Sequence, residues 1–552
     1  SSDRFAVCLP PRGGKTVQAP EIRDGQKRTP RRRAAARGSL LGFREDRRAV
    51  NIVFVASEAV PFAKTGGLAD VAGALPRAVA ELGHQTALFI PCYRKAWDQG
   101  TELVGTGVSI DVPVGSATIR GHVFESRVPG SEVPVYLVDQ PAYFDRDGFY
   151  GNLGHDFDDN CERFVFFQRA VLEATAALGL RPDVLHCNDW QTGLIPVYLK
   201  TLYADAFGPT APGSLLTVHN LAYQGLFWHW DLPVTRLPWS LFNHRELEFH
   251  GKLSFLKAGL VFADLLTTVS PTYAKEIQTQ RQGAGLDGLL RERRADLRGI
   301  VNGIDVGAWS PSRESMLAER YDVDTAAVGK AACKAWLQER AGLPVRPDVP
   351  LFAQIGRLDP QKGWDLLAEV ADRFLQEDVQ LVVLGTGHPK YHDLLEGLAA
   401  RYPQKVWAHL GFSDELAHQI EAGADVFLMP SLFEPCGLNQ LYSLAHGTVP
   451  VVHATGGLVD TVVDLTPRSL ADGSATGFVF RQPTPAALWE ALVRVLDVWR
   501  DRNVWRKLAR AGMSTDWSWD RSARKYVEVY REIARRGRPH LAQDDPAAAV
   551  PA

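Results

Sequence analysis

The sequence predicts an α/β protein with two doubly wound, Rossmann-like domains that face each other across a deep cleft. Short β-branched strands alternate with amphipathic helices in both halves of the chain. The 552 residues exceed the roughly 250–300 residues that one hydrophobic core can hold, so two domains are expected. A glycine motif at residues 65–71 recurs at residues 455–461, and each copy follows a strand and opens a helix. Two helix N-termini with free N–H groups would then face each other across the cleft.

The first half begins with a βαβ unit. Residues 50–56 read VNIVFVA, a run typical of a buried parallel strand. Residues 68–82 carry apolar side chains at helical spacing, and Gly83 follows as a C-terminal stop. The next strand is expected at residues 87–90. Further buried strands are expected at residues 183–187, 215–218 and 265–269.

The second half repeats this alternation after an interruption. Around residues 303–345 the rhythm is lost, so we expect the domain boundary there, with domains at residues 49–305 and 306–515. Strands are expected at residues 351–355, 380–384, 426–429 and 449–452. In doubly wound sheets the ligand lies outside the carboxyl ends of the strands.

Composition excludes several classes of protein. Hydrophobic residues make up 45% and charged residues 23%, as in ordinary soluble enzymes, and no apolar run approaches the roughly 18 residues of a membrane span. The six cysteines are scattered without a CxxC pair, which indicates reduced thiols and no zinc site.

The N-terminal segment differs in charge from the rest of the chain. Residues 1–48 hold 13 Lys+Arg and 5 Asp+Glu, whereas the remainder holds 48 and 59. An acidic body argues against nucleic-acid binding. The segment is interpreted as a disordered basic tail or as the remnant of an organelle transit peptide, and residues 538–552 as a second disordered tail.

Lys64-Thr65-Gly66-Gly67 follows the first strand. Adjacent glycines let the backbone approach an anion, and Lys64 adds a cation at the same place. The alternative is a plain turn with a surface lysine; no Walker A pattern is present.

Residues 356–363, GRLDPQKG, directly follow another buried strand. Arg357 and Lys362 can therefore converge at the carboxyl end of that strand, where two cations suit a diphosphate. The alternative is a pair of solvated charges at a turn.

Residues 431–438, SLFEPCGL, follow the strand at residues 426–429. Glu434, ahead of a proline and near Gly437, can accept hydrogen bonds from sugar hydroxyls. The alternative is a helix N-terminal charge. Cys436 fits a small buried residue better than a nucleophile.

Asp189 and His219 end two strands of the first domain and are expected to point toward the same crevice. Two DxD patterns, at residues 145–147 and 156–158, lie in a glycine-rich loop and not after a clean strand. We therefore expect no metal, because two lysines and an arginine can neutralise a diphosphate.

Six motifs occur in an order that identifies a family. They are KTGGLADV at 64–71, HCNDWQTG at 186–193, TVHNLAYQG at 217–225, GRLDPQKG at 356–363, EPCGLNQLY at 434–442 and TGGLVDTV at 455–462. Together they resemble the bacterial glycogen synthases and plant starch synthases of glycosyltransferase family 5, which have the GT-B fold. The resemblance spans residues 50 to 535; Gln191 departs from it where many members have His, and Asp189 before it is intact.

The resemblance implies roles for the matching positions. The catalytic set would be Glu434, Asp189, His219, Lys362 and Arg357. The substrate-binding set would be Lys64, Gly66, Gly67, Asp70, Asn302, Gly385, Cys436, Gly437, Leu438, Thr455, Gly456 and Gly457. A final helix at residues 516–537 would cross back to the first domain.

The resemblance also implies an activity. A retaining glucosyltransferase would move glucose from ADP-glucose, or from UDP-glucose as in some members, to the non-reducing end of an α-1,4-glucan, glycogen or starch. No cofactor, nucleic acid or membrane is implied, and the oligomeric state is not given. The compartment would be the bacterial cytoplasm, or the plastid stroma if the tail is a transit-peptide remnant. Two alternatives remain: another GT-B transferase with a small acceptor, and a catalytically silent glucan-binding protein.

Retention of configuration permits two mechanisms. The acceptor hydroxyl can attack from the face of the leaving group, with the leaving phosphate as base, and we favour this route. A double displacement would need a nucleophile beneath the anomeric carbon, for which the sequence offers Asp189 or Glu434.

Overall fold

The computed structural model describes residues 48–536 except 99, 101, 153, 209 and 210. Two predicted tails, residues 1–48 and 538–552, lie outside the described residues, except for Arg48. Cys8 and the last residue of the predicted final helix, residue 537, lie outside them as well.

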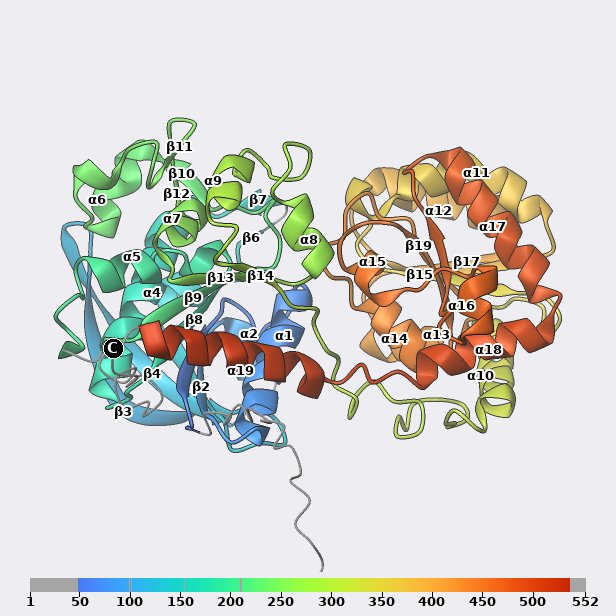
Figure 1. Ribbon diagram of the computed structural model, residues 1–552, viewed down its shortest axis with the longest axis horizontal. Helices are drawn as coiled ribbons and strands as arrows, with labels where there is room; N and C mark the ends of the chain where they lie inside the picture. Colours follow the sequence, from blue (N-terminus) through green and yellow to red (C-terminus); the bar gives the residue numbers. More distant parts are fainter. Residues whose placement is uncertain (1–47, 99, 101, 153, 209–210, 537–552) are drawn as a thin grey trace, which may run out of the picture. The chain divides into compact units, whose positions relative to one another are not determined.

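The first half is built on a nine-stranded sheet (Figure 1). Its strand order is β14-β13-β9-β8-β1-β2-β5-β4-β3, in which all pairs from β14 to β5 are parallel and β4 and β3 are antiparallel. The strands are β1 (Asn51–Val55), β2 (Gln85–Pro91), β3 (Val104–Val114), β4 (Ala117–Arg127), β5 (Pro134–Asp139), β8 (Val184–Asn188), β9 (Gly213–Val218), β13 (Leu265–Thr268) and β14 (Leu297–Gly299).

Helices and short strands fill the connections of this half. The helices are α1 (Gly67–Glu81), α2 (Arg94–Asp98), α3 (Pro141–Phe144), α4 (Asn160–Ala177), η1 (Trp190–Thr192), α5 (Ile195–Lys200), η3 (His229–Asp231), α6 (Leu232–Thr235), η4 (Trp239–Leu241), α7 (Phe255–Phe262), α8 (Pro271–Glu276) and α9 (Asp287–Glu292). The short strands are β6 (Gly151–Asn152), β7 (His155–Asp156), β10 (Leu226–Trp228), β11 (Glu248–Phe249) and β12 (Lys252–Ser254).

The second half is built on a six-stranded parallel sheet. Its order, β17-β16-β15-β18-β19-β20, is the doubly wound order in which the chain starts at the centre and reverses direction once. The strands are β15 (Leu351–Ile355), β16 (Gln380–Gly385), β17 (Val406–Leu410), β18 (Val426–Met429), β19 (Val449–His453) and β20 (Phe478–Phe480).

Helices connect these strands and close the chain. They are α10 (Ala326–Arg340), η5 (Pro360–Lys362), α11 (Trp364–Gln376), α12 (Pro389–Arg401), α13 (Asp414–Gly423), α14 (Asn439–Ala445), α15 (Gly456–Thr461), α16 (Pro467–Ala471), α17 (Pro485–Trp499), α18 (Arg502–Met513) and α19 (Trp519–Arg536).

The parallel strands are buried because helices cover them, which explains their continuous apolar runs. In β8 and β18 all residues are buried, and in β1 all but the first are buried. The helix predicted at residues 68–82 is α1, whose apolar stripe is buried. The prediction of an α/β chain with two doubly wound, Rossmann-like domains is confirmed.

Helix α19 packs on the first half of the chain, against α1 and β9 (Figure 1). Tyr530 on this helix hydrogen-bonds Nδ1 of His186 in β8, with 2.8 Å between the hydroxyl oxygen and the ring nitrogen. Ser522 donates to the carbonyl of Val301. The C-terminal helix is therefore tied to the strand that carries Asp189 at its end.

Two parts of the local structure were not predicted from the sequence. The sequence indicated only a loss of rhythm at residues 303–345, whereas α10 lies there and packs on α13 through Cys333 and Leu337. The antiparallel pair β3 and β4 was also missed. Its strands leave alternate residues exposed, unlike the buried runs on which the prediction relied.

Within the described part of the chain, no helix combines the length and apolar character needed to cross a membrane.

Candidate functional site

Several predicted site residues follow the strands at which each sheet reverses its winding. In the first sheet β1 and β8 are neighbours whose connections leave in opposite directions, and in the second sheet β15 and β18 are the equivalent pair. Ligands of doubly wound sheets bind outside the carboxyl ends of such strands. Lys64 and Asp189 follow β1 and β8, while Arg357 and Glu434 follow β15 and β18.

The turn after β15 carries the two predicted cations of the second half. The side chain of Asp359 accepts a hydrogen bond from the backbone N–H of Lys362 and so caps η5. The turn ends at Gly363, whose φ of +75° favours glycine; a Cβ there would also lie 2.1 Å from the carbonyl oxygen of Pro430. This close approach holds the turn against the end of β18.

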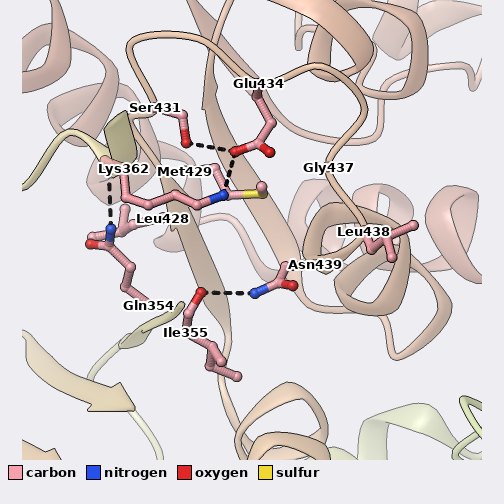
Figure 2. A pocket seen from close by; sticks show the side chains of 10 residues that line it. All are labelled: Gln354, Ile355, Lys362, Leu428, Met429, Ser431, Glu434, Gly437, Leu438 and Asn439. Carbon is pink, nitrogen blue, oxygen red and sulfur yellow. Dashed lines mark hydrogen bonds and ion pairs between the residues drawn. The ribbon is translucent and has the colours of Figure 1, made fainter. Parts of the chain in front are cut away.

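Lys362 and Glu434 point toward one another in the pocket drawn in Figure 2. Their Nζ and Oε2 atoms are 2.7 Å apart, and the Ser431 hydroxyl donates to the same carboxylate oxygen at 3.0 Å. The Lys362 side chain is 22% exposed and that of Glu434 is 8% exposed. The charge of the buried carboxylate is thus compensated by a cation that still reaches solvent.

The ends of β15 and β18 and the segments that follow them line this pocket. The lining residues are Gln354, Ile355, Lys362, Leu428, Met429, Ser431, Glu434, Gly437, Leu438 and Asn439. Four predicted site residues, Lys362, Glu434, Gly437 and Leu438, therefore share one pocket. Asn439 donates to the backbone carbonyl of Ile355 at 2.8 Å and links the two connections.

Arg357 lies at the start of the same turn and is half exposed. Its guanidinium pairs with Asp359 at 3.2 Å and donates to the hydroxyl of Tyr223 at 3.3 Å. Each predicted cation of this half thus has its own carboxylate, Asp359 for Arg357 and Glu434 for Lys362.

Cys436 is buried behind the pocket. Burial raises the pKa of its thiol to about 12, so the group stays protonated at neutral pH. The expectation that Cys436 is a small buried residue and not a nucleophile agrees with this environment.

The loop Thr455-Gly456-Gly457 lies directly behind Glu434. The Gly457 N–H donates to the carbonyl of Glu434 at 3.2 Å. At Gly456, φ is +44° and a Cβ would lie 1.9 Å from that carbonyl, so only glycine fits this position. Gly385, at the end of β16, packs in the same way on the carbonyl of Gly356.

Asp189 and His219 meet at the ends of β8 and β9. The Asp189 carboxylate accepts a hydrogen bond from the backbone N–H of His219 at 2.7 Å. Burial raises the pKa of Asp189 to about 7, and the backbone hydrogen bonds from His219 and Asn220 oppose part of that rise. A carboxyl group that titrates near neutrality is characteristic of functional sites.

The imidazole of His219 is neutral and its tautomer follows from its partner. Burial lowers its pKa to about 3. Its Nε2 lies 2.9 Å from Oδ1 of Asn188, whose amide nitrogen already donates to the carbonyls of Val55 and His186. The Asn188 oxygen must therefore accept, and Nε2 of His219 carries the hydrogen.

Lys64 and the glycine pair lie at the start of α1. Lys64 pairs with Asp70 at 2.8 Å, and Gly66 and Gly67 are exposed at the helix N-terminus. Burial raises the pKa of Asp70, and the nearby Lys64 ammonium opposes part of that rise. Both predicted residues therefore belong to one ion pair beside exposed backbone N–H groups.

A buried carboxylate that the sequence did not single out holds this loop. Glu58 accepts hydrogen bonds from the backbone N–H and the hydroxyl of Thr65, and from the hydroxyl of Tyr150. It follows β1 by three residues, so its position after a strand was the signal that could have identified it.

Contacts join the two sets of site residues. A Cβ at Gly67 would lie 3.5 Å from Cδ1 of Leu438. The backbone of Asn302 hydrogen-bonds Cys436, and Tyr223 bonds Arg357 as described above.

Helices α8 and α15 cap one another. Asp460 on α15 accepts hydrogen bonds from the Ser270 hydroxyl and from the backbone and hydroxyl of Thr272, at the start of α8. In return Glu276, the last residue of α8, accepts from Thr455 and from the Gly456 N–H at 3.1 Å. We call this pair of contacts the α8–α15 clasp. Each carboxylate lies at the positive end of the other helix.

The clasp corrects one expectation. The sequence predicted free N–H groups at both helix N-termini, but the Gly456 N–H donates to Glu276. The two residues are far apart in sequence, and no local pattern signals the pairing.

The DxD pattern at residues 145–147 has another use in the structure. Both of its aspartates pair with Arg94, at 2.6 and 2.7 Å. Among the described residues, no cluster of His, Cys, Asp and Glu side chains is arranged to hold a metal ion.

Two family models match the chain. The model for the starch synthase catalytic domain matches residues 51–292, and the model for group 1 glycosyl transferases matches residues 337–512.

Curated relatives match over most of the chain. A glycogen synthase of Anaeromyxobacter sp. (strain Fw109-5) is 49% identical over 486 residues, which cover 88% of this chain and 100% of that protein. Glycogen synthase 1 of Methylococcus capsulatus is 46% identical over 488 residues, which cover 88% of this chain and 96% of that protein.

Solved structures extend the comparison. The catalytic domain of starch synthase IV from Arabidopsis thaliana, bound to ADP and acarbose, aligns with a TM-score of 0.82 and 31% identity, covering 88% of this chain and 100% of that chain. A sucrose-phosphate synthase from Thermosynechococcus elongatus aligns with a TM-score of 0.54 and 19% identity, covering 88% and 99%, which is a likeness of fold alone.

Proposed function

This chain belongs to the glycogen and starch synthase family of glycosyltransferases, and we propose that it elongates an α-1,4-glucan by retaining transfer of glucose from ADP-glucose. The observation that carries the proposal is the Lys362–Glu434 pair, set in a pocket at the point where the second sheet reverses its winding. The ADP and acarbose named for the Arabidopsis structure support a nucleoside diphosphate and an oligosaccharide as ligands. UDP-glucose is the alternative donor.

Three cations neutralise the leaving diphosphate in this proposal. They are Lys64, Arg357 and Lys362, which lie at the carboxyl ends of β1 and β15. The exposed backbone at Gly66 and Gly67 adds N–H donors at the start of α1. Because these groups are fixed before charge develops, they stabilise the transition state without reorganisation.

Glu434 and His219 recognise the transferred glucose in this proposal. The Glu434 carboxylate, held by Lys362 and Ser431, accepts hydrogen bonds from sugar hydroxyls. Neutral His219 keeps Nδ1 as an acceptor, because Nε2 carries the hydrogen. The remaining substrate-binding residues proposed for the sugar, the phosphates and the nucleotide are Asp70, Asn302, Gly385, Cys436, Gly437, Leu438, Thr455, Gly456 and Gly457.

We propose a front-face mechanism. The glycosidic bond to the diphosphate breaks, the acceptor 4-hydroxyl bonds to the anomeric carbon on the same face, and its proton passes to the leaving phosphate oxygen. One oxygen of Glu434 is engaged by Lys362, and one oxygen of Asp189 by the His219 amide. Both carboxylates are thus oriented by these contacts, which favours binding and electrostatic roles over nucleophilic attack.

Further assignments complete the proposal. Residues 49–305 form the acceptor domain, residues 306–515 the nucleotide-sugar domain, and the enzyme acts in the cytoplasm. The proposed acceptor is a glucan, and no metal takes part.

An acceptor comparison tests the function. Labelled ADP-glucose and UDP-glucose are each offered with glycogen, fructose 6-phosphate or glucose 6-phosphate. The proposal expects incorporation into glycogen, faster from ADP-glucose. Transfer to a sugar phosphate would favour another transferase of the same fold, and glycogen binding without turnover would favour a silent glucan-binding protein.

Two variants test the site assignment. Lys362→Ala and Glu434→Ala should each lower kcat by about 100-fold or more, since both act on the reacting group. Circular dichroism and thermal unfolding check that the fold persists. Near-normal turnover in both variants would remove Lys362 and Glu434 from the catalytic set.

A further inference from the structure

Three tryptophans form an exposed aromatic surface on the first half of the chain. Trp228, Trp230 and Trp239 have 61%, 58% and 48% of their surface exposed. Their rings adjoin, with centroids 6.3 Å apart for the first pair and 5.6 Å for Trp230 and Trp239. Phe242 continues the surface, 5.9 Å from Trp239. We call Trp228, Trp230 and Trp239 the tryptophan platform.

The local fold holds these rings on the solvent-facing side of the segment. In β10 alternate side chains face opposite sides, so Phe227 packs inward on Phe255 at 4.6 Å while Trp228 faces outward. Leu232 and Leu237 are buried and hold the following segment in place. The exposure is therefore not that of a loose loop.

The platform is large enough to bind a ligand and too small for a stable protein interface. At these exposures the three indoles present roughly 400 Å² to water, which is in the range of the largest exposed apolar patch of a typical monomer, and such a patch is often functional. A specific protein interface needs about 800 Å² per partner. The three indoles are also uncharged, which suits a neutral ligand.

The base of the platform packs on the residue next to Asp189. Phe227, between its neighbours in β10, contacts the ring of Trp190 at 5.7 Å. Trp190 directly follows Asp189. The segment that carries the platform is therefore anchored, through the core, on the end of β8.

We propose that the tryptophan platform binds an α-1,4-glucan chain at glucose units remote from the reacting end. The inference rests on the proposed function and names a second contact for its acceptor. Pyranose rings have apolar C–H faces that pack on aromatic rings. The platform rings are inclined to each other by 65° and 74°, so they suit a curved chain, as α-1,4 linkage produces, better than a flat ribbon.

The test compares long and short acceptors in a platform variant. The triple variant Trp228→Ala/Trp230→Ala/Trp239→Ala should raise KM for glycogen about tenfold or more, because a second attachment is lost. kcat should not change, nor should KM for ADP-glucose or for maltotriose, which is too short to span both places. The matched control is Trp97→Ala, which removes another exposed tryptophan, 47% exposed, on α2.

Binding measurements keep the proposal testable if the triple variant does not fold. Migration through a gel that contains glycogen should be retarded for the wild type and for Trp97→Ala, and less so for the single variant Trp230→Ala. If the enzyme is active and its glycogen affinity is unchanged in all platform variants, the platform proposal is overturned and the proposed function stands. A change of oligomeric state with unchanged glycogen affinity also overturns it and assigns the surface to a second copy of the chain. A wild type that turns over neither glycogen nor maltotriose instead overturns the proposed function.

Discussion

Replacing Asp189 with asparagine should make the protein more stable at alkaline pH and less active. Asp189 lies just after β8, is buried, and has its pKa raised by burial to about 7 from an ordinary value of 3.8. Asparagine has nearly the same shape, and its oxygen can still accept from the His219 N–H. The backbone at this position has φ of 56° and ψ of −171°, a strained conformation for asparagine and aspartate alike, so the substitution does not add backbone strain. The substitution therefore removes the ionisation with little change of packing.

The size of the effect follows from proton linkage. Below pH 3.8 the carboxyl group is neutral in the folded and unfolded states alike. As pH rises from there to about 7, only the unfolded chain ionises fully, so the folded protein loses stability. At pH values above the pKa of the folded state, the loss of unfolding free energy reaches about 4 kcal/mol. The asparagine side chain of the variant cannot ionise, so the variant avoids this loss.

Thermal unfolding at two pH values measures the difference. At about pH 8.5 the Asp189→Asn variant should unfold several degrees higher than the wild type, at about 2–4 °C per kcal/mol for a cooperative unit of 150–250 residues. At about pH 5.5 the advantage should shrink by about half. Turnover should fall about 100-fold, because a buried ionisable group held at a stability cost is characteristic of function.

A pH-independent result would refute this reasoning. If the variant is no more stable than the wild type at alkaline pH, or if its advantage is the same at both pH values, Asp189 does not carry the raised pKa. Asp147→Asn serves as the control, since it makes the same chemical change at a side chain that is 78% exposed, and its thermal unfolding should stay close to that of the wild type.

Three further predictions concern the contacts around the site. Lys362→Met leaves the buried carboxylate of Glu434 without its cation and should cost about 1–3 kcal/mol of stability. The double variant Lys362→Met/Glu434→Gln should recover at least half of that stability in thermal unfolding, without regaining turnover. Strict additivity of the two single-variant effects would contradict the pairing. The Ser270 hydroxyl caps α8 by accepting from the backbone N–H of Tyr273, and Asp460 adds a second cap by accepting from that of Thr272. Asp460→Ala removes this second cap at about 1 kcal/mol, so hydrogen exchange of the α8 amides should accelerate. Unchanged protection would argue that the clasp contributes nothing. Tyr530→Phe leaves Nδ1 of buried His186 without its partner and should lower the free energy of unfolding by about 1–3 kcal/mol with kcat preserved; a loss of kcat at normal stability would contradict a purely structural role.

The parallel strands could be predicted because burial on both faces leaves a readable run of apolar residues. The strands at residues 351–355 and 426–429 match β15 and β18 in both bounds. The hairpin of β3 and β4 was missed because its exposed faces break such runs. Its signals were period-two alternation and the two-residue turn at Gly115 and Ser116, which connects the two strands.

The candidate site was predictable where chemistry follows a strand directly. Lys362 and Glu434 each stand after a central strand of the second sheet, and they form an ion pair across two connections. Contacts between distant segments gave no such signal. Glu276 meets Gly456 only because α8 and α15 lie together in the folded chain. Side-chain partners of this kind depend on tertiary packing and not on local pattern.

The most direct test of the central claim is the linkage of the glucose that the enzyme adds. Glycogen elongated with labelled ADP-glucose is digested with β-amylase, which removes maltose from the non-reducing ends of α-1,4 chains. Retaining transfer from ADP-glucose predicts that nearly all label is released as maltose. Label that resists digestion, or that never enters glycogen, would contradict the account.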